Sequence, residues 1–259
     1  EKELYLESGQ SYALDALPRL LWVKNKLPEI YEKIDCIGMF NDWLIYKLTG
    51  ILAVEPSNGS TTGLMDLKTR TWDPSILERC GLKSSIFPPV QESGTIAGTV
   101  TADAALQTGL TEGTLVVVGG GDAQLGCIGV GAVDANDAAI FGGSFWQYEY
   151  NTDRADTDPQ CRVRVNCHAV KNIWQYEALA FKPGLVMRWF RDGFCQLEKQ
   201  IAENSGCDVY DLMNREAEKI PAGCYGMMCT FSDVMNFINW KHAAPTHLDF
   251  IRLILIITS

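Results

Sequence analysis

The stretch "TLVVVGGGDAQLGCIGVG", residues 114–131, determines how the rest of the chain is interpreted. A β-branched, apolar run precedes three glycines, and a single aspartate, Asp122, opens a segment of small residues able to form a helix. A strand, a glycine turn and a helix in this order indicate an α/β unit. Two roles stay open for Asp122 at this point. It caps the helix, or it is a carboxylate that a ligand approaches closely because the preceding glycines lack side chains.

The segments before this stretch are mainly helical in pattern. Residues 14–34 predict two short helices or one helix kinked at Pro28, since proline disrupts a helix interior. Residues 39–50 predict a helix that ends at a glycine. Asp73, followed by a proline, and Thr101 are placed to cap two further helices.

Strands and helices alternate through the remaining segments. Residues 115–118 predict a buried strand, residues 136–151 two strands joined by a glycine turn, and residues 162–181 two more. Residues 184–206 have the most amphipathic helical pattern of the chain, and residues 208–228 predict a helix that leads into a strand. This alternation predicts the α/β fold class.

Composition excludes several classes of partner. The 259 residues are 47% apolar, and the net charge of −10 is spread along the chain without a basic stripe, so we expect no nucleic-acid partner. The apolar run near the end of the chain is shorter than the roughly 20 residues that a membrane helix needs. Nine cysteines are scattered without C-x-x-C spacing, which favours reduced thiols in a cytoplasmic protein and predicts no metal site formed by protein side chains.

Six motifs in order resemble the FGGY carbohydrate kinases: "PRLLWVKNKLPEIYEKI", "NDWLIYKLTG", "SNGSTTGLMDLKTRTWD", "GGGDAQLGCIGVGAV", "IFGGSFW" and "KPGLVMRWFRDGF". The resemblance runs from about residue 10 to about residue 245. It implies an actin-like, ribonuclease-H-like ATPase fold with an incomplete N-terminal domain at residues 1–135. The beginning of the second domain would follow at residues 136–259, with residues 245–259 as a divergent tail.

The resemblance also implies roles for particular residues. Asp122 falls on the family's catalytic base, which accepts a proton from a substrate hydroxyl while that oxygen attacks the γ-phosphate of ATP, with Mg²⁺ on the phosphates. Gln124 falls where it could donate a hydrogen bond to substrate, and a surface polar residue is the alternative. In the first family signature, Arg19 stands in place of the usual lysine and Ala16 in place of a small hydroxylic residue or proline.

The expected nucleotide contacts lie further along the chain. Gly142, Gly143 and Ser144 fall on the family's second phosphate loop, where Gly143 replaces the usual threonine; a plain hairpin turn is the alternative. Gly184 matches a glycine near the nucleotide. Arg188 falls where relatives contact ATP, and a charged helix face explains it almost as well.

The family activity implied is ATP-dependent phosphorylation of a primary hydroxyl on a small sugar-like molecule. A linear dihydroxy-dione is the first expectation, and a ketopentose such as xylulose or ribulose is the alternative. The family's first phosphate motif would lie before residue 1 and its adenosine motif beyond residue 259, so we expect this chain alone to be inactive. A binding protein derived from a kinase, or a pseudogene product without function, are the remaining alternatives.

Overall fold

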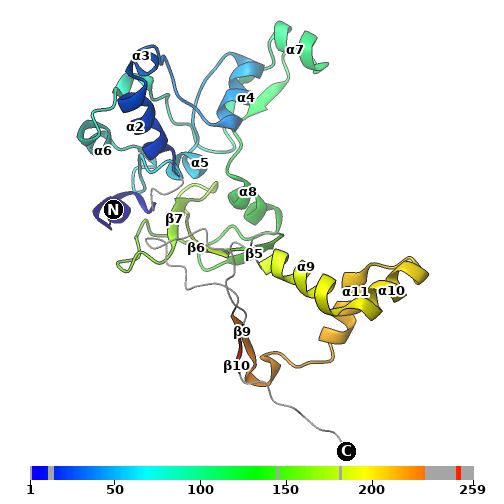
Figure 1. Ribbon diagram of the computed structural model, residues 1–259. Helices are drawn as coiled ribbons and strands as arrows, with labels where there is room; N and C mark the ends of the chain where they lie inside the picture. The colour runs from blue at the N-terminus through cyan, green and yellow to red at the C-terminus, as the bar shows by residue number, and fades with distance from the viewer. Residues whose placement is uncertain (1, 11–14, 144–145, 181–182, 231–248, 252–259) are drawn as a thin grey trace, which may run out of the picture. The chain divides into compact units, whose positions relative to one another are not determined.

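The computed structural model describes residues 2–10, 15–143, 146–180, 183–230 and 249–251 (Figure 1). These residues form two compact units. The first unit holds the described residues up to 141 together with 147–179, and the second holds the described residues from 180 onward with 142, 143 and 146. The pattern is mixed α/β, in agreement with the fold class expected from the sequence.

The first part of the first unit is helical. Its helices are α1 (Lys2–Ser8), α2 (Ala16–Lys26), α3 (Pro28–Tyr31), α4 (Phe40–Thr49) and α5 (Pro56–Ser60). Pro28 begins α3 as its first residue, so the break predicted at this proline is confirmed as two separate helices. Gly50 ends α4 with φ of 76°, a left-handed conformation that glycine adopts without the steric penalty of a Cβ atom.

Short strands and helices follow. They are β1 (Met65–Asp66), β2 (Thr71–Trp72), α6 (Pro74–Arg79), the 3₁₀ turn η1 (Ser84–Ile86), β3 (Ile96–Thr99), α7 (Ala102–Thr108) and β4 (Leu115–Val117). Both predicted caps are confirmed, since the side chain of Asp73 accepts hydrogen bonds from two backbone amides of α6 and Thr101 accepts one from α7.

The prediction of a buried strand at 115–118 is wrong for most of its length. Strand β4 pairs with β3 in a two-stranded antiparallel sheet, and Leu115 and Val117 are 60% and 51% exposed. Val118 alone is buried, where it packs with Ile45 and Ala97. A β-branched run predicts a strand, but which faces are covered depends on strands and helices distant in sequence.

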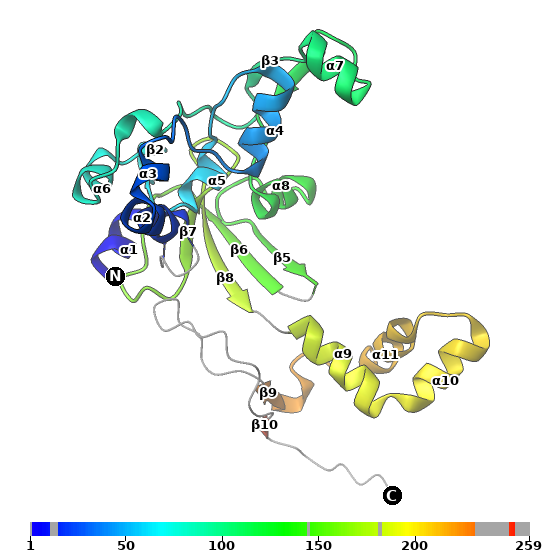
Figure 2. The same cartoon turned by 45° about the horizontal axis from the view of Figure 1, so that its top comes forward.

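The first unit also contains a four-stranded sheet, which lies beside helix α8 (Asp122–Gly129) (Figure 2). Helix α8 leads into β5 (Ala138–Gly142) and β6 (Trp146–Thr152), and β7 (Arg164–Cys167) and β8 (Trp174–Ala180) complete the sheet in the order β5-β6-β8-β7. These are the four strands expected from residues 136–151 and 162–181. Helix α8 packs on β5 through Cys127, Ala139 and Phe141.

Hydrogen bonds join the early helical part to this sheet. The hydroxyl of Ser60 in α5 accepts from the backbone N–H of Cys167 at 3.0 Å, and the indole of Trp174 donates to the backbone oxygen of Leu67 at 2.7 Å. Leu67, Val165, Cys167 and Trp174 form one apolar cluster. The segment around α5 is therefore held against β7, which brings residues about 100 positions apart to one place.

The second unit contains three helices and a short strand pair among the described residues. They are α9 (Pro183–Phe194), α10 (Gln196–Ser205), α11 (Val209–Ala217), the 3₁₀ turn η2 (Cys224–Gly226), β9 (Met228–Thr230) and β10 (Asp249–Ile251). The helix expected over 184–206 is interrupted at Cys195, where the backbone leaves helical geometry. The units are not divided at residue 135, and the domain assignment of 1–135 and 136–259 stays a prediction.

Candidate active site

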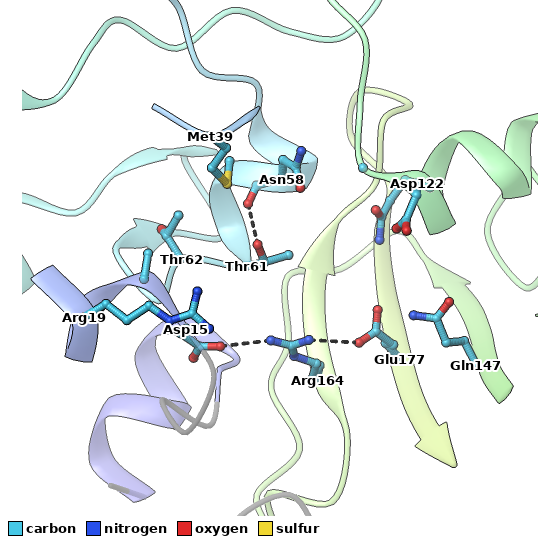
Figure 3. Close-up of a pocket in the computed structure, with 13 residues that line it drawn as sticks. Asp15, Arg19, Met39, Asn58, Thr61, Thr62, Asp122, Gln147, Arg164 and Glu177 are labelled. Atoms are coloured by element: carbon cyan, nitrogen blue, oxygen red, sulfur yellow. Dashed lines mark hydrogen bonds and ion pairs between the residues drawn. The ribbon is translucent and has the colours of Figure 1, made fainter. Parts of the chain in front are cut away.

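A pocket of about 370 Å³ opens in the first unit, between the start of α8, the helices α2 and α5, and the strands β6 to β8 (Figure 3). Ten of its thirteen lining residues have polar or charged side chains. The lining residues are Asp15, Ala16, Arg19, Met39, Asn58, Thr61, Thr62, Gly121, Asp122, Gln124, Gln147, Arg164 and Glu177. A small pocket with this many hydroxyl, amide and carboxylate groups fits a hydroxyl-rich ligand better than an apolar one.

An ion-pair network forms one side of this pocket. Arg164 of β7 lies between two carboxylates, donating to Asp15 at 2.9 Å and to Glu177 at 3.3 Å (Figure 3). It also donates to the side chain of Gln10 at 3.1 Å. Arg164 and Glu177 are directly opposite each other in the antiparallel pairing of β7 with β8. Asp15 and Glu177 are 3% and 5% exposed, so this arginine compensates two buried negative charges.

Asp122 is the first residue of α8, and the N-cap position belongs to Gly121. Its carboxylate accepts a hydrogen bond only from the adjacent Ala123 N–H among the interactions described, at 2.7 Å, and the residue is exposed where it lines the pocket. The alternative role of Asp122 as N-cap is therefore wrong. A carboxylate at a helix N-terminus is favoured by the helix dipole, and this one remains accessible to a ligand.

The three glycines before Asp122 serve the protein's own packing at two positions. A Cβ atom on Gly121 would lie 2.1 Å from the side-chain oxygen of Gln124, and one on Gly120 would lie 3.2 Å from the Ser57 hydroxyl. The N–H of Gly121 donates to that hydroxyl at 2.8 Å. Gly119 has open space around it, so packing does not require a glycine there, and room for a ligand at this position stays a prediction.

Gln124 is 3% exposed, so the alternative of a surface polar residue is wrong. Its amide nitrogen donates to the side-chain oxygen of Gln175 at 2.7 Å, and Gln175 in turn donates to Asn151 at 3.2 Å. This buried chain of amides fixes the orientation of Gln124 at the edge of the pocket. Substrate binding by Gln124 stays a prediction. In it, the hydrogen-bonding groups of the Gln124 amide that do not bind Gln175 face the ligand.

Helix α5 contributes the opposite wall. The carboxylate of Glu55 caps it by accepting from the backbone N–H groups of Ser57 at 2.6 Å and Asn58 at 2.7 Å. The Thr61 hydroxyl donates to the backbone oxygen of Asn58 at 2.7 Å, while the Asn58 side chain donates to Asn41 at 3.0 Å. These internal bonds hold the wall in one conformation.

Two residues of the first family signature also line the pocket. Ala16 and Arg19 belong to α2, and the Arg19 side chain is exposed at the pocket wall. The segment in which these residues depart from the family pattern is thus next to Asp122 in space.

Four of the five expected nucleotide residues are described, and they lie in two places. Gly142 ends β5 and Gly143 follows it in the connection to β6, whereas Ser144 lies outside the described residues. Gly184 and Arg188 belong to α9 in the second unit, where Arg188 is exposed. Nucleotide binding by all five stays a prediction.

Three charged residues that line the pocket, and the buried Glu149 near them, were not found by sequence reasoning. Arg164, Glu149 and Glu177 occur in strands with alternating polar residues, and Asp15 precedes α2. The alternation in "RVRVN" and "WQYEA" indicates one polar face, but a polar strand face is usually solvated. No local signal marks these glutamates as buried, because glutamate is rarely fully buried unless it is paired.

Over the described ranges, no group of three or more histidine, cysteine, aspartate or glutamate residues is arranged to hold a metal ion. Within the same ranges, no helix has both the length and the apolar character needed to cross a bilayer.

Comparison with known proteins identifies the family. Residues 2–129 match the N-terminal domain of the FGGY family of carbohydrate kinases. Over 249 residues the chain is 50% identical to an autoinducer-2 kinase of Klebsiella pneumoniae and 49% identical to one of Yersinia enterocolitica, covering 96% of this chain and 47% of each relative. The chain thus spans about half the length of the curated relatives it matches.

Solved structures show the same fold. The xylulose kinase of Rhodospirillum rubrum superposes with a TM-score of 0.77 at 22% identity, covering 99% of this chain and 50% of that one. A gluconate kinase of Lactobacillus acidophilus gives 0.77 at 21% identity over 97% of this chain and 49% of that one. By the N-terminal domain match and by the sequence shared with autoinducer-2 kinases, this chain belongs to the FGGY family of carbohydrate kinases.

Proposed function

We propose that this chain is the part of an ATP-dependent sugar kinase that holds the sugar and the catalytic base, with Asp122 as that base. The observation that carries the proposal is the position of Asp122: a carboxylate exposed in a polar pocket, at a helix N-terminus, and not used as a cap. The proposed substrate is 4,5-dihydroxypentane-2,3-dione, the linear form of autoinducer-2. The 50% sequence identity to autoinducer-2 kinases supports this substrate over a ketopentose.

The proposed reaction follows from general phosphoryl-transfer chemistry. The substrate's primary hydroxyl gives its proton to the Asp122 carboxylate as the hydroxyl oxygen forms a bond to the γ-phosphorus of ATP. The bond between that phosphorus and the β,γ-bridging oxygen breaks, and ADP leaves with the electron pair. For this, Asp122 must lie within roughly 2.6–3.2 Å of the hydroxyl, a distance that its exposed position allows.

The pocket walls orient the ligand. Asn58, Thr61 and Gln147 line the same pocket as Asp122, and their hydroxyl and amide groups suit the hydroxyl and carbonyl oxygens of a short linear sugar. Because Arg164 is bound by Asp15 and Glu177, its position is fixed before any ligand arrives.

ATP is proposed to contact Gly142, Gly143, Ser144, Gly184 and Arg188, as the family resemblance implies. Magnesium would neutralise the nucleotide's phosphates. The described residues offer no dedicated metal cage, so the ion would be held mainly by phosphate oxygens and water. We further propose a cytoplasmic role in processing the quorum-sensing signal, with sugar and ATP as the partners.

The substrate assignment is tested with the full-length protein that contains this chain. ATP-dependent phosphorylation of 4,5-dihydroxypentane-2,3-dione is compared with that of xylulose and ribulose under the same conditions. We expect the highest kcat/KM for the dihydroxy-dione. A higher kcat/KM for either ketopentose would replace the proposed substrate, while leaving the kinase assignment intact.

A further inference from the structure

Glu149 is a fully buried carboxylic acid next to the pocket, with 0% of its surface exposed. It lies on β6 two residues after Gln147, and side chains two positions apart share one face of a strand. Gln147 lines the pocket, so Glu149 faces the same side of the sheet as the pocket. Within the described part of the chain, neither of its oxygens receives a hydrogen bond from a donor group.

The neighbouring strand carries a second buried carboxyl group, that of Glu177. Strands β6 and β8 are adjacent, so Glu149 and Glu177 lie on neighbouring strands of the sheet. A buried carboxylate that receives no hydrogen bond is far more costly than the neutral acid, and only the protonated acid can donate to a neighbouring carboxylate. Glu177 accepts from Arg164 at 3.3 Å and from Asn166 at 3.4 Å, which stabilises its charged form. The proton therefore belongs on Glu149.

The surrounding charges agree with this assignment. Glu177 on β8 and Asp122 on α8 repel a charged Glu149, and Arg164 on β7 attracts it more weakly. Cys127 of α8 also faces the group, and burial together with Glu149 raises the pKa of its thiol to about 11. Burial first, and then the charge of Glu177, raise the pKa of Glu149 well above its usual range.

We propose that Glu149 is a positioning residue of this site, which stays protonated at neutral pH and donates a hydrogen bond to Glu177, holding Glu177 against Arg164. The proton keeps a third buried negative charge out of a site whose central arginine is already shared by Asp15 and Glu177. The effect of this proton on sugar binding rests on the proposed function, whereas the protonation of Glu149 itself does not. Losing the proton at alkaline pH would push Glu177 away from Arg164 and deform the pocket.

Infrared difference spectroscopy tests the proton directly. At pH 7, the spectrum of the wild-type protein minus that of Glu149→Gln should show the carbonyl band of one protonated carboxylic acid. Glu92→Gln is the matched control, because Glu92 binds Arg70 through both oxygens at 2.8 Å and should contribute a carboxylate band only. Absence of an acid band from the Glu149 difference would overturn the proposal.

A second variant keeps the test decisive if Glu149→Gln folds poorly. Glu177→Gln removes the neighbouring charge, so the acid band of Glu149 should persist at pH 7 but disappear at a lower pH than in the wild type. An unchanged midpoint would mean that the two carboxyl groups do not interact, which also contradicts the proposal.

The positioning role is tested by calorimetric titration with 4,5-dihydroxypentane-2,3-dione as a function of pH. Wild-type binding should be lost as the Glu149 acid band disappears, and Glu149→Gln, whose amide still donates to Glu177, should keep its binding over the same range. Equal loss in both proteins would contradict the positioning role. Absence of binding at every pH would refute the proposed substrate, while the acid band would still decide the protonation of Glu149.

Discussion

At the scale of single residues, the site depends on one arginine. Arg164 is the cation that Asp15 and Glu177 share, and its side chain is 14% exposed. Removing it would leave two buried carboxylates without their counter-charge, which costs far more than losing an exposed ion pair. We therefore expect a substitution of Arg164 to act mainly by lowering the stability of the structure around the pocket.

We predict that Arg164→Met lowers the free energy of unfolding by about 3 kcal/mol, measured by urea denaturation. The matched control is Arg154→Met, because Arg154 is 73% exposed and pairs with Asp156 at 3.4 Å at the surface. The control should change the same free energy by less than about 1 kcal/mol. Equal effects of the two variants would show that Arg164 does not hold buried charges.

A buried histidine should make the fold acid-sensitive. His168 is 0% exposed and accepts from the Val170 N–H at 2.9 Å, and burial, with a smaller contribution from Arg70, lowers its pKa to about 4. The unfolded chain, with an ordinary histidine pKa of about 6.5, binds the proton more readily. The stability from neutral His168 is thus fully present above about pH 6.5 and lost as the pH falls through 4.

The measurement is the free energy of unfolding against pH for the wild type and for His168→Asn, which keeps an acceptor. The wild type should lose roughly 3 kcal/mol more than the variant between pH 6.5 and 4. Parallel curves would show that His168 titrates alike in the folded and unfolded chain.

At the scale of elements, the glycines that precede α8 differ in what an added side chain would meet. Gly119 and Gly121 both precede Asp122, but only at Gly121 would a Cβ atom collide with the protein, at 2.1 Å from the Gln124 oxygen. We predict that Gly121→Ala displaces Gln124 from Gln175 and lowers the melting temperature. Gly119→Ala should leave the melting temperature unchanged and weaken sugar binding. A Gly119→Ala protein with normal sugar affinity would show that this glycine provides no room for a ligand.

Local signals predicted the elements better than their partners. The breaks at Pro28 and Gly50 and the caps at Asp73 and Thr101 depend on one or two neighbouring residues, and the structure confirms them. The exposure of Leu115 depends on which elements cover β4, which its own sequence does not contain. Local propensity therefore gave the order of elements and left their burial undetermined.

The candidate site also combines features that local sequence predicts with features that depend on distant elements. Asp122 was found because glycines and a helix start surround it in sequence, and family resemblance supplied its proposed role. The pair of Arg164 with Asp15 joins residues 149 positions apart, and Glu149 and Glu177 are on neighbouring strands only because β6 lies beside β8. Strand order is a property of the folded sheet, so these charges could not be paired from the sequence.

At the scale of the whole molecule, each unit presents apolar side chains to solvent. In the first unit, Phe40 and Leu106 are each 86% exposed, and in the second, Phe194 and Leu197 are 63% and 66% exposed. We predict that the purified chain binds a hydrophobic dye while folded and associates as its concentration rises, measured by fluorescence and light scattering. A monomeric chain with no dye binding would show that these side chains are covered in solution.

The length of this chain relative to its curated relatives also bears on the activity expected of the chain alone. Phosphoryl transfer depends on positioning both substrates, and the chain spans about half the length of its curated relatives. We predict sugar-dependent ADP release from the full-length protein and none from this chain by itself. Turnover by the chain alone would show that its described pocket is sufficient for catalysis.

The most direct test of the central claim is ADP release by the full-length protein with Asp122→Asn, measured with the dihydroxy-dione, ATP and Mg²⁺. Asparagine keeps the size and polarity of the side chain but cannot accept the hydroxyl proton as a carboxylate does. Turnover should fall by roughly 10²–10⁴-fold while calorimetry shows that sugar and nucleotide still bind. Near-normal turnover in this variant would contradict the assignment of Asp122 as the catalytic base.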